Sequence, residues 1–240
     1  METVSKNRII ISLGGSLIVP DGIDWKFLKG FKELIEGEIA KGKTFILVTG
    51  GGRTARSYID AASFIAPVSD EDRDWLGIHS TRLNAHLVRT IFRDHAYPRI
   101  NTNPHDLDDF YLAKDPILVA AGWRPGHSTD YDAVLLGKYL DATKIANLSN
   151  ISYVYDKDPN EHADAKRFDV MTWKEFRGIV GEEWSPGLNT PFDPIAARLA
   201  EQEGMEVAIL SGGDLPNLKK YLDDESFNGT IIKDVKLEVG

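Results

Sequence analysis

The 240-residue sequence contains no cysteine. A disulfide framework, a thiolate zinc site and a cysteine nucleophile are therefore excluded, and the absence is compatible with a reducing compartment. Long apolar runs are also missing, because no segment approaches the roughly 20 apolar residues that span a bilayer. The first residues hold only a short apolar stretch interrupted by glycines, which is too brief for a secretory signal. We therefore expect a cytoplasmic protein without a membrane partner.

Positive charge is scarce. The chain has 28 Lys and Arg against 37 Asp and Glu, which gives a formal net charge of -9. This balance disfavours a nucleic-acid-binding protein, which would present a basic surface to the phosphate backbone. A single anionic ligand remains compatible with it, since such a ligand needs only a few backbone N–H groups and one or two cations.

Short apolar runs of strand length alternate with helical patterns. Because the runs are apolar throughout and helices separate them, they predict an α/β fold with a mainly parallel sheet covered on both faces. We find no repeat, low-complexity tract or linker, and we expect one domain over residues 1–240. The expected strands cover residues 8–13, 44–50, 116–122, 144–150 and 205–212.

Two helix starts are marked by specific residues. Thr172 and Glu175 form the pattern of a capping box, and Asp193 followed by Pro194 is typical of an N-cap before a proline in the first turn. Between these signals, the segment 151–192 is otherwise irregular, and long loops of this kind often carry function.

Three of the expected strands end in turn-rich loops. Because ligands bind outside the carboxyl ends of parallel strands, these loops predict an anion site at one sheet edge, although each one alone is equally well a tight turn. Arg53 and Arg56 share a helix face, so either of them could grip a phosphate while the other is solvated. The three loops are Gly14-Gly15-Ser16, Gly50 to Arg56, and Gly122 to Asp130.

Neither a Walker loop nor a Rossmann glycine fingerprint is present in the sequence. The residues alone therefore lead to an α/β protein with several anion-binding loops at one edge.

Taken in order, the motifs resemble the amino acid kinase family, and within it the shorter, archaeal type of uridylate (UMP) kinase. The resemblance covers almost the whole chain, through "ISLGGSL", "VTGGGRTARSYI", "DWLGIHSTRLNAHLV", "AGWRPGHSTDYDAVLLGKYLDA", "NLSNISYVYDKDP", "FDPIAARLA" and "NGTII". It implies a three-layer αβα sandwich of roughly eight strands, transfer of the ATP γ-phosphoryl group to UMP, a requirement for Mg2+, and a homohexamer built from dimers. It also implies an acceptor-binding part at about 1–145 and an ATP-binding part at about 146–240.

The resemblance assigns site residues by position. On the ATP side it places Gly15, Ser16, Gly52, Arg56, Ser149, Tyr155 and Asp158. On the UMP side it places Gly51, Asp74, Trp123, Arg124, Pro125, Gly126, His127, Ser128 and Thr129. For catalysis it assigns Arg56, Asp130 and Asp193, and it names no direct metal ligand.

Several of these residues also have a plain structural interpretation. Asp74 is either the residue that recognises the nucleoside end of UMP or an exposed carboxylate near a helix start, and Asp158 before Pro159 is a turn former that can also contact ATP. Asp193 is a helix cap that can also organise the site. Because the acceptor phosphate is itself the nucleophile, Asp130 and Asp193 are better interpreted as organisers of the metal and nearby cations than as bases.

The chain departs from the family pattern at a few positions. Ser12 stands where many members have a lysine, and Ser152 and Tyr153 replace an acidic residue and a glycine. Trp123 replaces a residue that is commonly a small threonine. These changes leave two alternatives to UMP phosphorylation: a phosphotransferase with another small phosphate, carboxylate or carbamate acceptor, and a nucleotide-binding or storage protein that has lost catalysis.

Overall fold

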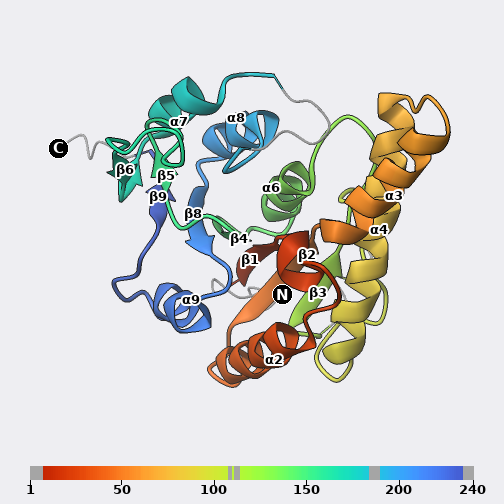
Figure 1. Cartoon of the computed structure of the whole chain (residues 1–240). Coiled ribbons are helices and arrows are strands. Elements are labelled where there is room, and N and C mark those ends of the chain that lie inside the picture. The colour runs from red at the N-terminus through yellow and green to blue at the C-terminus, as the bar shows by residue number, and fades with distance from the viewer. Residues whose placement is uncertain (1–7, 108–109, 111–113, 184–189, 235–240) are drawn as a thin grey trace.

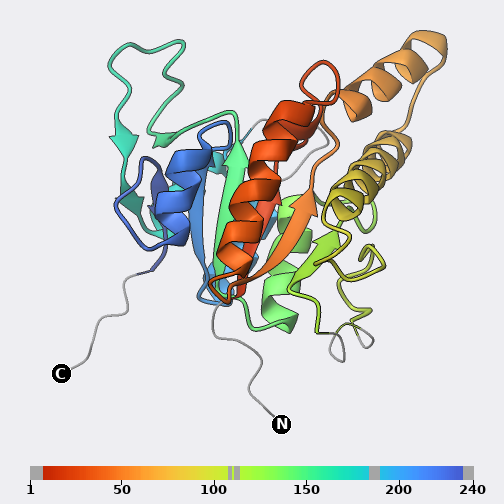
Figure 2. The same ribbon diagram turned by 90° about the horizontal axis from the view of Figure 1, so that it is seen from below.

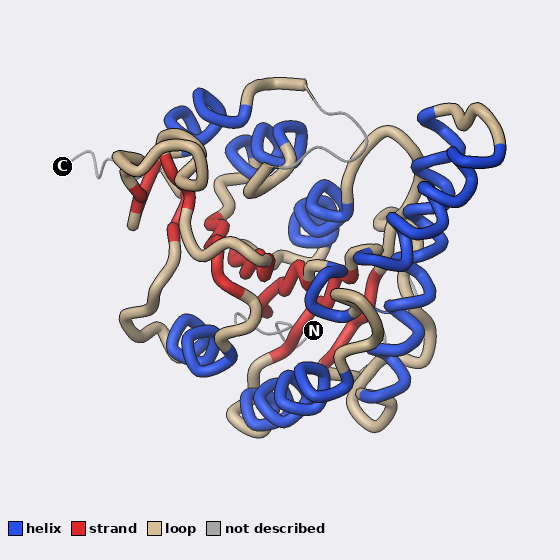
Figure 3. Tube along the Cα trace, viewed as in Figure 1, coloured by secondary structure: helices blue, strands red, loops and turns tan. Residues whose placement is uncertain are grey.

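The structure is a computed structural model that describes residues 8–107, 110, 114–183 and 190–234. Figure 1 shows a central sheet with helices on both sides, and Figure 3 separates the strands from the helices by colour. The expected three-layer αβα architecture is confirmed.

The main sheet has seven strands within the described residues, in the order β3-β2-β1-β4-β8-β9-β7. All neighbouring pairs are parallel except β8 with β9. The strands are β1 (Arg8–Leu13), β2 (Thr44–Thr49), β3 (Ile117–Ala120), β4 (Lys144–Ser149), β7 (Val170–Met171), β8 (Glu206–Ser211) and β9 (Thr230–Ile232). β5 (Val154–Tyr155) and β6 (Arg167–Phe168) form a separate antiparallel pair, so the described main sheet has one strand fewer than expected.

Two sets of helices cover the two faces of the sheet. One face is covered by α6 (Thr129–Tyr139), α7 (Trp173–Val180) and α8 (Pro194–Gln202), whose buried side chains join one core cluster. The other is covered by α2 (Trp25–Ile39), α4 (Asp70–Ile91) and α9 (Leu215–Leu222). α3 (Gly52–Ile65) packs on α4 and projects past the sheet, and α1 (Gly15–Ile18) is a single short turn (Figure 1).

The sequence explains how these elements form. In α2 the apolar residues Leu28, Phe31 and Ile35 recur every three or four positions and are almost fully buried, which gives the helix one face toward the sheet. The capping box of Thr172 and Glu175 is present at α7. Among the described residues, no helix is long and apolar enough to cross a membrane.

The strands that carry the glycine loops end at the same edge. Figure 2 shows β2 and β4 pointing to that edge, where α3 and the excursion between β5 and β6 extend beyond the sheet. β1 is central, because it pairs with β2 on one side and with β4 on the other. The chain therefore reverses its direction of travel across the sheet at β1, which is where parallel α/β sheets open a crevice for a ligand.

Candidate active site

The loops after β1 and β2 interlock through their glycines. A β-carbon on Gly15 would lie 2.0 Å from the backbone nitrogen of Gly52, and one on Gly52 would lie 2.2 Å from the carbonyl oxygen of Gly15. Gly52 also has a φ of +62°, which side chains other than glycine rarely adopt. These two glycines are therefore required by the close approach of two backbones and not only by the tightness of each turn.

Backbone hydrogen bonds fix this junction to its surroundings. The Gly14 N–H donates to the carbonyl of Leu148 at the end of β4 (2.9 Å), and the Gly50 N–H donates to that of Leu13 (3.0 Å). α3 begins here with Gly51 as its N-cap, so no side chain covers the start of this 14-residue helix. The Arg53 N–H donates to the carbonyl of Val19, so the remaining N–H groups of this first turn and the positive dipole end are what the helix start offers to an anion.

An acidic pair lies beside the junction. Asp130, near the start of α6, accepts a hydrogen bond from the Ser12 hydroxyl (3.0 Å) through one carboxylate oxygen and from the backbone N–H of Asp193 (3.3 Å) through the other. Asp193 caps α8 by accepting from the N–H groups of Ile195 (2.6 Å) and Ala196 (3.0 Å). Burial, together with the negative charge of Asp193, raises the pKa of Asp130 to about 7. The two N-termini of α6 and α8 thus meet at one pair of carboxyl groups.

The segment from Gly122 to Ser128, here called the acceptor loop, is held by α4. Asp74 accepts a hydrogen bond from the N–H of Gly126 (2.9 Å), while Arg82 donates to the carbonyl oxygens of Gly122 (3.2 Å) and Trp123 (2.8 Å). Asp74 is the fifth residue of α4, and Ser69 caps that helix. Its carboxylate is therefore engaged with the loop rather than being a solvated charge at a helix start.

Two further residues of α4 position the loops and, like Arg82, were missed in the sequence. Asn84 donates to the carbonyl oxygens of Gly50 (2.8 Å) and Gly51 (3.2 Å), and the Thr81 hydroxyl accepts from the Gly122 N–H (2.8 Å). Both lie with Arg82 in the run "STRLN". The signal was available, because buried polar side chains in the middle of an amphipathic helix need partners.

Rings surround the acceptor loop. The ring of Trp123 lies 4.9 Å from that of His105 and 5.6 Å from that of His127, and the guanidinium of Arg124 lies 4.1 Å above its face. His127 in turn lies 4.5 Å from Tyr131. Trp123 is therefore packed between neighbours on several sides, and Arg124 is stacked as well as exposed.

The arginines of α3 differ in their surroundings. Arg53 lies 3.8 Å from the Asp21 carboxylate, and its backbone N–H donates to the carbonyl of Val19 (3.0 Å). Arg56 is exposed, and within the described part of the chain its side chain has no recorded hydrogen bond or ion pair. Arg56 is thus the guanidinium that is available to an anionic ligand.

The residues expected on the adenine side are spread along the chain edge. Ser149 ends β4, and its hydroxyl accepts from the Ile151 N–H (3.3 Å). Tyr155 belongs to β5, whereas Asp158 is exposed and accepts from the N–H of Asn160 (2.8 Å), as a turn-forming residue does. No recorded hydrogen bond joins Tyr155 or Asp158 to the described glycine loops. Of the three residues, Ser149 is the one that lies beside a glycine loop, next to Gly14.

Comparison with known proteins shows the family of the chain. The profile of the amino acid kinase family matches residues 7–211. The chain belongs to the amino acid kinase family. It is 33% identical over 230 residues to a uridylate kinase of Methanococcoides burtonii, a match that covers 95% of this chain and 97% of that protein. A uridylate kinase of Thermococcus sibiricus is 34% identical and covers 88% and 93% respectively. The crystal structure of uridylate kinase from Archaeoglobus fulgidus superposes with a TM-score of 0.80 at 28% identity, over 93% of this chain and 99% of that one.

Two of the positions that depart from the family pattern, Ser152 and Tyr153, lie in the turn between β4 and β5. Ser152 is exposed. The Tyr153 hydroxyl donates to Asn228 (3.3 Å), and the guanidinium of Arg167 lies 4.5 Å above the Tyr153 ring. The tyrosine thus joins the turn after β4 to β6 and to the turn before β9 by side-chain contacts that a glycine does not provide.

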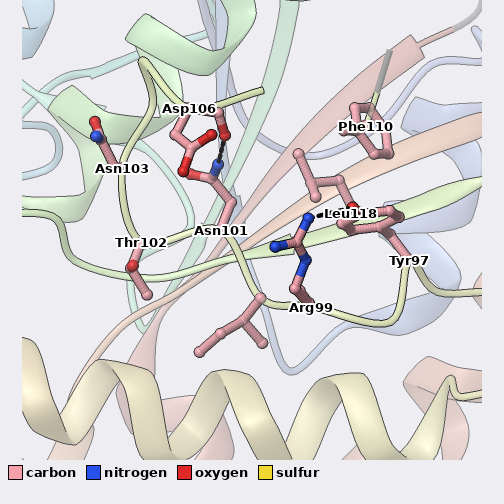
Figure 4. Close-up of a pocket in the computed structure, with 9 residues that line it drawn as sticks. Tyr97, Arg99, Asn101, Thr102, Asn103, Asp106, Phe110 and Leu118 are labelled. Atoms are coloured by element: carbon pink, nitrogen blue, oxygen red, sulfur yellow. Dashed lines mark hydrogen bonds between the residues drawn. The ribbon is translucent and has the colours of Figure 1, made fainter. Parts of the chain in front are cut away.

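A hollow near β3 lies apart from the predicted site of this amino acid kinase. It has a volume of about 100 Å³ and is lined by residues of the segment between α4 and β3. Figure 4 shows Asn101 bonded to Asp106 and Arg99 bonded to Tyr97 within it. None of the predicted site residues lines the hollow, so the group of loops after β1, β2 and β3, and not this hollow, is the candidate active site.

Proposed function

We propose that this protein is an ATP-dependent UMP kinase, which transfers the γ-phosphoryl group of ATP to the phosphate of UMP. The structural observation that carries the proposal is the interlocking of the glycine loops after β1 and β2, together with an acidic pair, Asp130 and Asp193, that lies at two helix N-termini and is bonded to Ser12 of β1. The curated relatives named above are uridylate kinases, and they match this chain over nearly its whole length. Both observations support a phosphotransferase whose two substrates are phosphates.

On the donor side, the residues at the junction would bind the ATP phosphates through their backbone N–H groups and the free guanidinium of Arg56. These residues are Gly15, Ser16 and Gly52, and we place the adenine end near Ser149, Tyr155 and Asp158. The start of α3 supports this assignment, because no side chain caps it and its dipole favours an anion. The donor part would comprise about residues 146–240 with the two glycine loops, and the acceptor part about residues 1–145, within one domain.

On the acceptor side, we place UMP against the acceptor loop and Gly51. Thr129 and the N-terminus of α6 would meet its phosphate, and Asp74 would recognise its nucleoside end through the carboxylate oxygen that does not accept from Gly126. Ser128 caps α6 by accepting from the Asp130 N–H (3.2 Å) and donates its own N–H to Asp193 (3.3 Å). The loop is therefore linked directly to the acidic pair.

The proposed reaction does not need a strong general base, because the acceptor phosphate is itself the nucleophile. Phosphoryl transfer proceeds through a loose transition state, so the protein mainly has to hold two anions in line and stabilise the developing charge. With Ser12 in the position of a lysine, this cationic function would fall to Arg56, Arg124 and Lys157. Asp130 and Asp193 would orient the loop and the helix starts around the reacting phosphates, as their hydrogen bonds already do.

The acidic pair fits a divalent cation. Burial and the negative charge of Asp193 raise the pKa of Asp130. A nearby positive charge would stabilise the ionised forms of both carboxyl groups. No three acidic or histidine side chains in the described residues gather to hold a metal, and we place Mg2+ chiefly on ATP phosphates and water, as is usual for this ion in kinases. When bound, Mg2+ would neutralise the phosphate oxygens, and Asp130 and Asp193 are the residues that would organise it.

The direct test is a product assay. We expect purified protein, ATP and Mg2+ to yield UDP with UMP and little product with CMP, AMP or GMP, as measured by chromatography. Arg56→Ala is expected to lower kcat/KM by about 100-fold, because it removes a cation at the phosphates. UDP formation is checked in the same assay for each variant.

Arg53→Ala is the matched control. It removes an arginine from the same helix turn, but one that already lies near Asp21, and it should retain kcat/KM within about threefold. Equal losses in the two variants would contradict the assignment of Arg56. Product with a different monophosphate alone would favour another acceptor, whereas ATP binding without any product would favour a nucleotide-binding protein, for which the missing lysine at Ser12 is the supporting observation.

We also propose that the protein assembles into a homohexamer built from dimers. The supporting observation is a set of exposed large apolar side chains on α3 and α4, where Phe64 is 91% and Ile65 is 86% exposed. Both residues lie at the end of α3 that projects from the sheet (Figure 1). Light scattering after gel filtration should give the mass of six chains, and Phe64→Ser with Ile65→Ser should reduce it. A wild-type mass of one chain would contradict the proposal.

A further inference from the structure

Asp132 is a buried carboxylate in the first turns of α6 that has no role in the site as described so far. Its side chain is almost inaccessible to water, in a helix whose neighbouring buried residues Ala133, Val134 and Leu136 are apolar. Burial raises the pKa of the Asp132 carboxyl, and His127 is the neighbour that does most to oppose this. A charge at such a position is costly unless it has partners.

The partners of Asp132 both belong to the acceptor loop. One carboxylate oxygen accepts a hydrogen bond from the backbone N–H of Trp123 (3.1 Å). The other lies 3.5 Å from Nε2 of His127, and the two side chains are 2% and 10% exposed. Asp132 therefore contacts the loop near its beginning and near its end, which brings the two ends to one carboxylate.

The His127 contact is longer than an ordinary hydrogen bond. Neither Nε2 of His127 nor the facing oxygen of Asp132 has a hydrogen-bond partner among the described residues, and both atoms are buried. Rings of Trp123 and Tyr131 pack against the imidazole at 5.6 Å and 4.5 Å, which limits the approach of water. The 3.5 Å contact is therefore the polar interaction recorded for both atoms.

The backbone at Gly122 and Trp123 is also bound from the side of α4. Arg82 donates to the carbonyl oxygens of Gly122 and Trp123, while Asp132 accepts from the N–H of Trp123. Arg82 also contributes a favourable charge to Asp132. The start of the acceptor loop is thus fixed between a cation on α4 and an anion on α6, and only the anion also reaches His127.

We propose that Asp132 is a positioning residue for the phosphate acceptor, which presets the acceptor loop through the Trp123 amide and the His127 imidazole. The inference rests on the proposed function for its substrate, since it assigns to this loop the phosphomonoester end of the acceptor nucleotide. Asp132 does not touch the substrate and acts through His127 and Trp123. It sets the affinity for the acceptor and leaves that for ATP unchanged.

Two substitutions separate the two contacts. Asp132→Asn keeps an oxygen that can accept from the Trp123 N–H and removes the charge that faces His127, whereas Asp132→Ala removes both contacts. Glu38→Gln is the matched control, because Glu38 is a buried carboxylate of α2 that pairs with Lys41 and Lys43 and lies outside the site. Each variant is compared with the wild type in steady-state kinetics and in hydrogen–deuterium exchange of the peptide spanning the acceptor loop.

We expect the KM for UMP to rise about fivefold in Asp132→Asn and at least tenfold in Asp132→Ala, with the KM for ATP within twofold of the wild type. Exchange in the acceptor loop should be faster in Asp132→Ala and unchanged in Glu38→Gln. In a His127→Gln background, Asp132→Asn should add less than twofold, because the two side chains act as a unit.

Other outcomes separate the inference from the proposed function. Unchanged loop exchange in Asp132→Ala, or equal changes of the two KM values, would overturn the positioning role while leaving UMP phosphorylation intact. Absence of UDP from the wild type would overturn the proposed function. The exchange comparison would then still decide whether Asp132 holds the loop, since it requires no turnover.

Discussion

Asp130→Asn is expected to abolish most activity while making the protein more stable. The variant keeps the size of the side chain but removes a negative charge from a half-buried pair, so the free energy of unfolding should rise by about 2 kcal/mol at pH 8. We expect kcat/KM for UMP phosphorylation to fall by about 100-fold, because Asp130 orders the N-termini of α6 and α8. Urea unfolding at several pH values and the UDP assay measure the two effects.

The contribution of Asp130 to the free energy of unfolding depends on pH. The pKa of Asp130 is about 7 in the folded protein, which is above the ordinary value of about 4 for an unfolded aspartate. The folded state therefore binds this proton more tightly than the unfolded state does. The stabilisation that this tighter binding contributes is fully present below pH 4 and is lost as the pH rises through 7. Asp130→Asn should lack this part of the pH dependence.

An exposed carboxylate on α3 provides the control. Asp60→Asn should leave the stability difference between pH 6 and pH 8 as it is in the wild type, since Asp60 is exposed to solvent. If Asp130→Asn unfolds at lower urea concentration than the wild type at pH 8, the ionised Asp130 stabilises the fold. The raised pKa assigned to Asp130 would then be wrong.

Gly52→Ala is expected to have the second large effect. The new methyl group would lie 2.2 Å from the Gly15 carbonyl oxygen on a backbone with φ of +62°, so the two loops would have to separate. We expect a loss of about 3 kcal/mol in the free energy of unfolding and at least a 100-fold loss of kcat/KM. Urea unfolding and calorimetric titration with ATP measure the effect on the fold and on the phosphate site.

Gly37→Ala is the matched control, because Gly37 is an exposed residue inside α2 and a β-carbon there would meet nothing within 4 Å. It should stabilise the protein by about 1 kcal/mol, as alanine does in a helix interior, and leave ATP binding unchanged. A tolerated Gly52→Ala variant with normal ATP affinity would show that the interlocked loops are not needed for the site.

The sequence was sufficient for five strands of the main sheet, because each of them is a largely apolar run followed by a turn; they are β1, β2, β3, β4 and β8. The same holds for the helix starts at Thr172 and Asp193, where a short-range pattern determines the local geometry. The short strands β7 and β9 were not predicted, since runs of two or three residues give no periodic signal. The meeting of Gly15 with Gly52 was not visible, since it depends on two backbones that are 37 positions apart. Periodicity describes one element at a time and does not state which residues of two elements touch.

The sequence also did not predict the roles of several polar residues inside helices. Arg82 and Asn84 look like ordinary residues of an amphipathic helix, and Asp132 follows Asp130 as if both belonged to a solvated first turn. Their partners are backbone groups of loops 9 to 41 residues away, and these contacts are made only when the helices pack on the sheet. The family resemblance likewise assigned roles to Asp74 and Asp193, which do hold the loop, but none to Arg82, Asn84 or Asp132.

The β1 loop has a mechanical consequence for the molecule. It is bonded to the end of β4 through Gly14 and is interlocked with the β2 loop through Gly15, so it ties the loops after β2 and β4 to each other. Moving either neighbour would break the Gly14 hydrogen bond or separate the packed backbones of Gly15 and Gly52. We therefore expect this glycine junction to stay in place while other loops of the candidate site move.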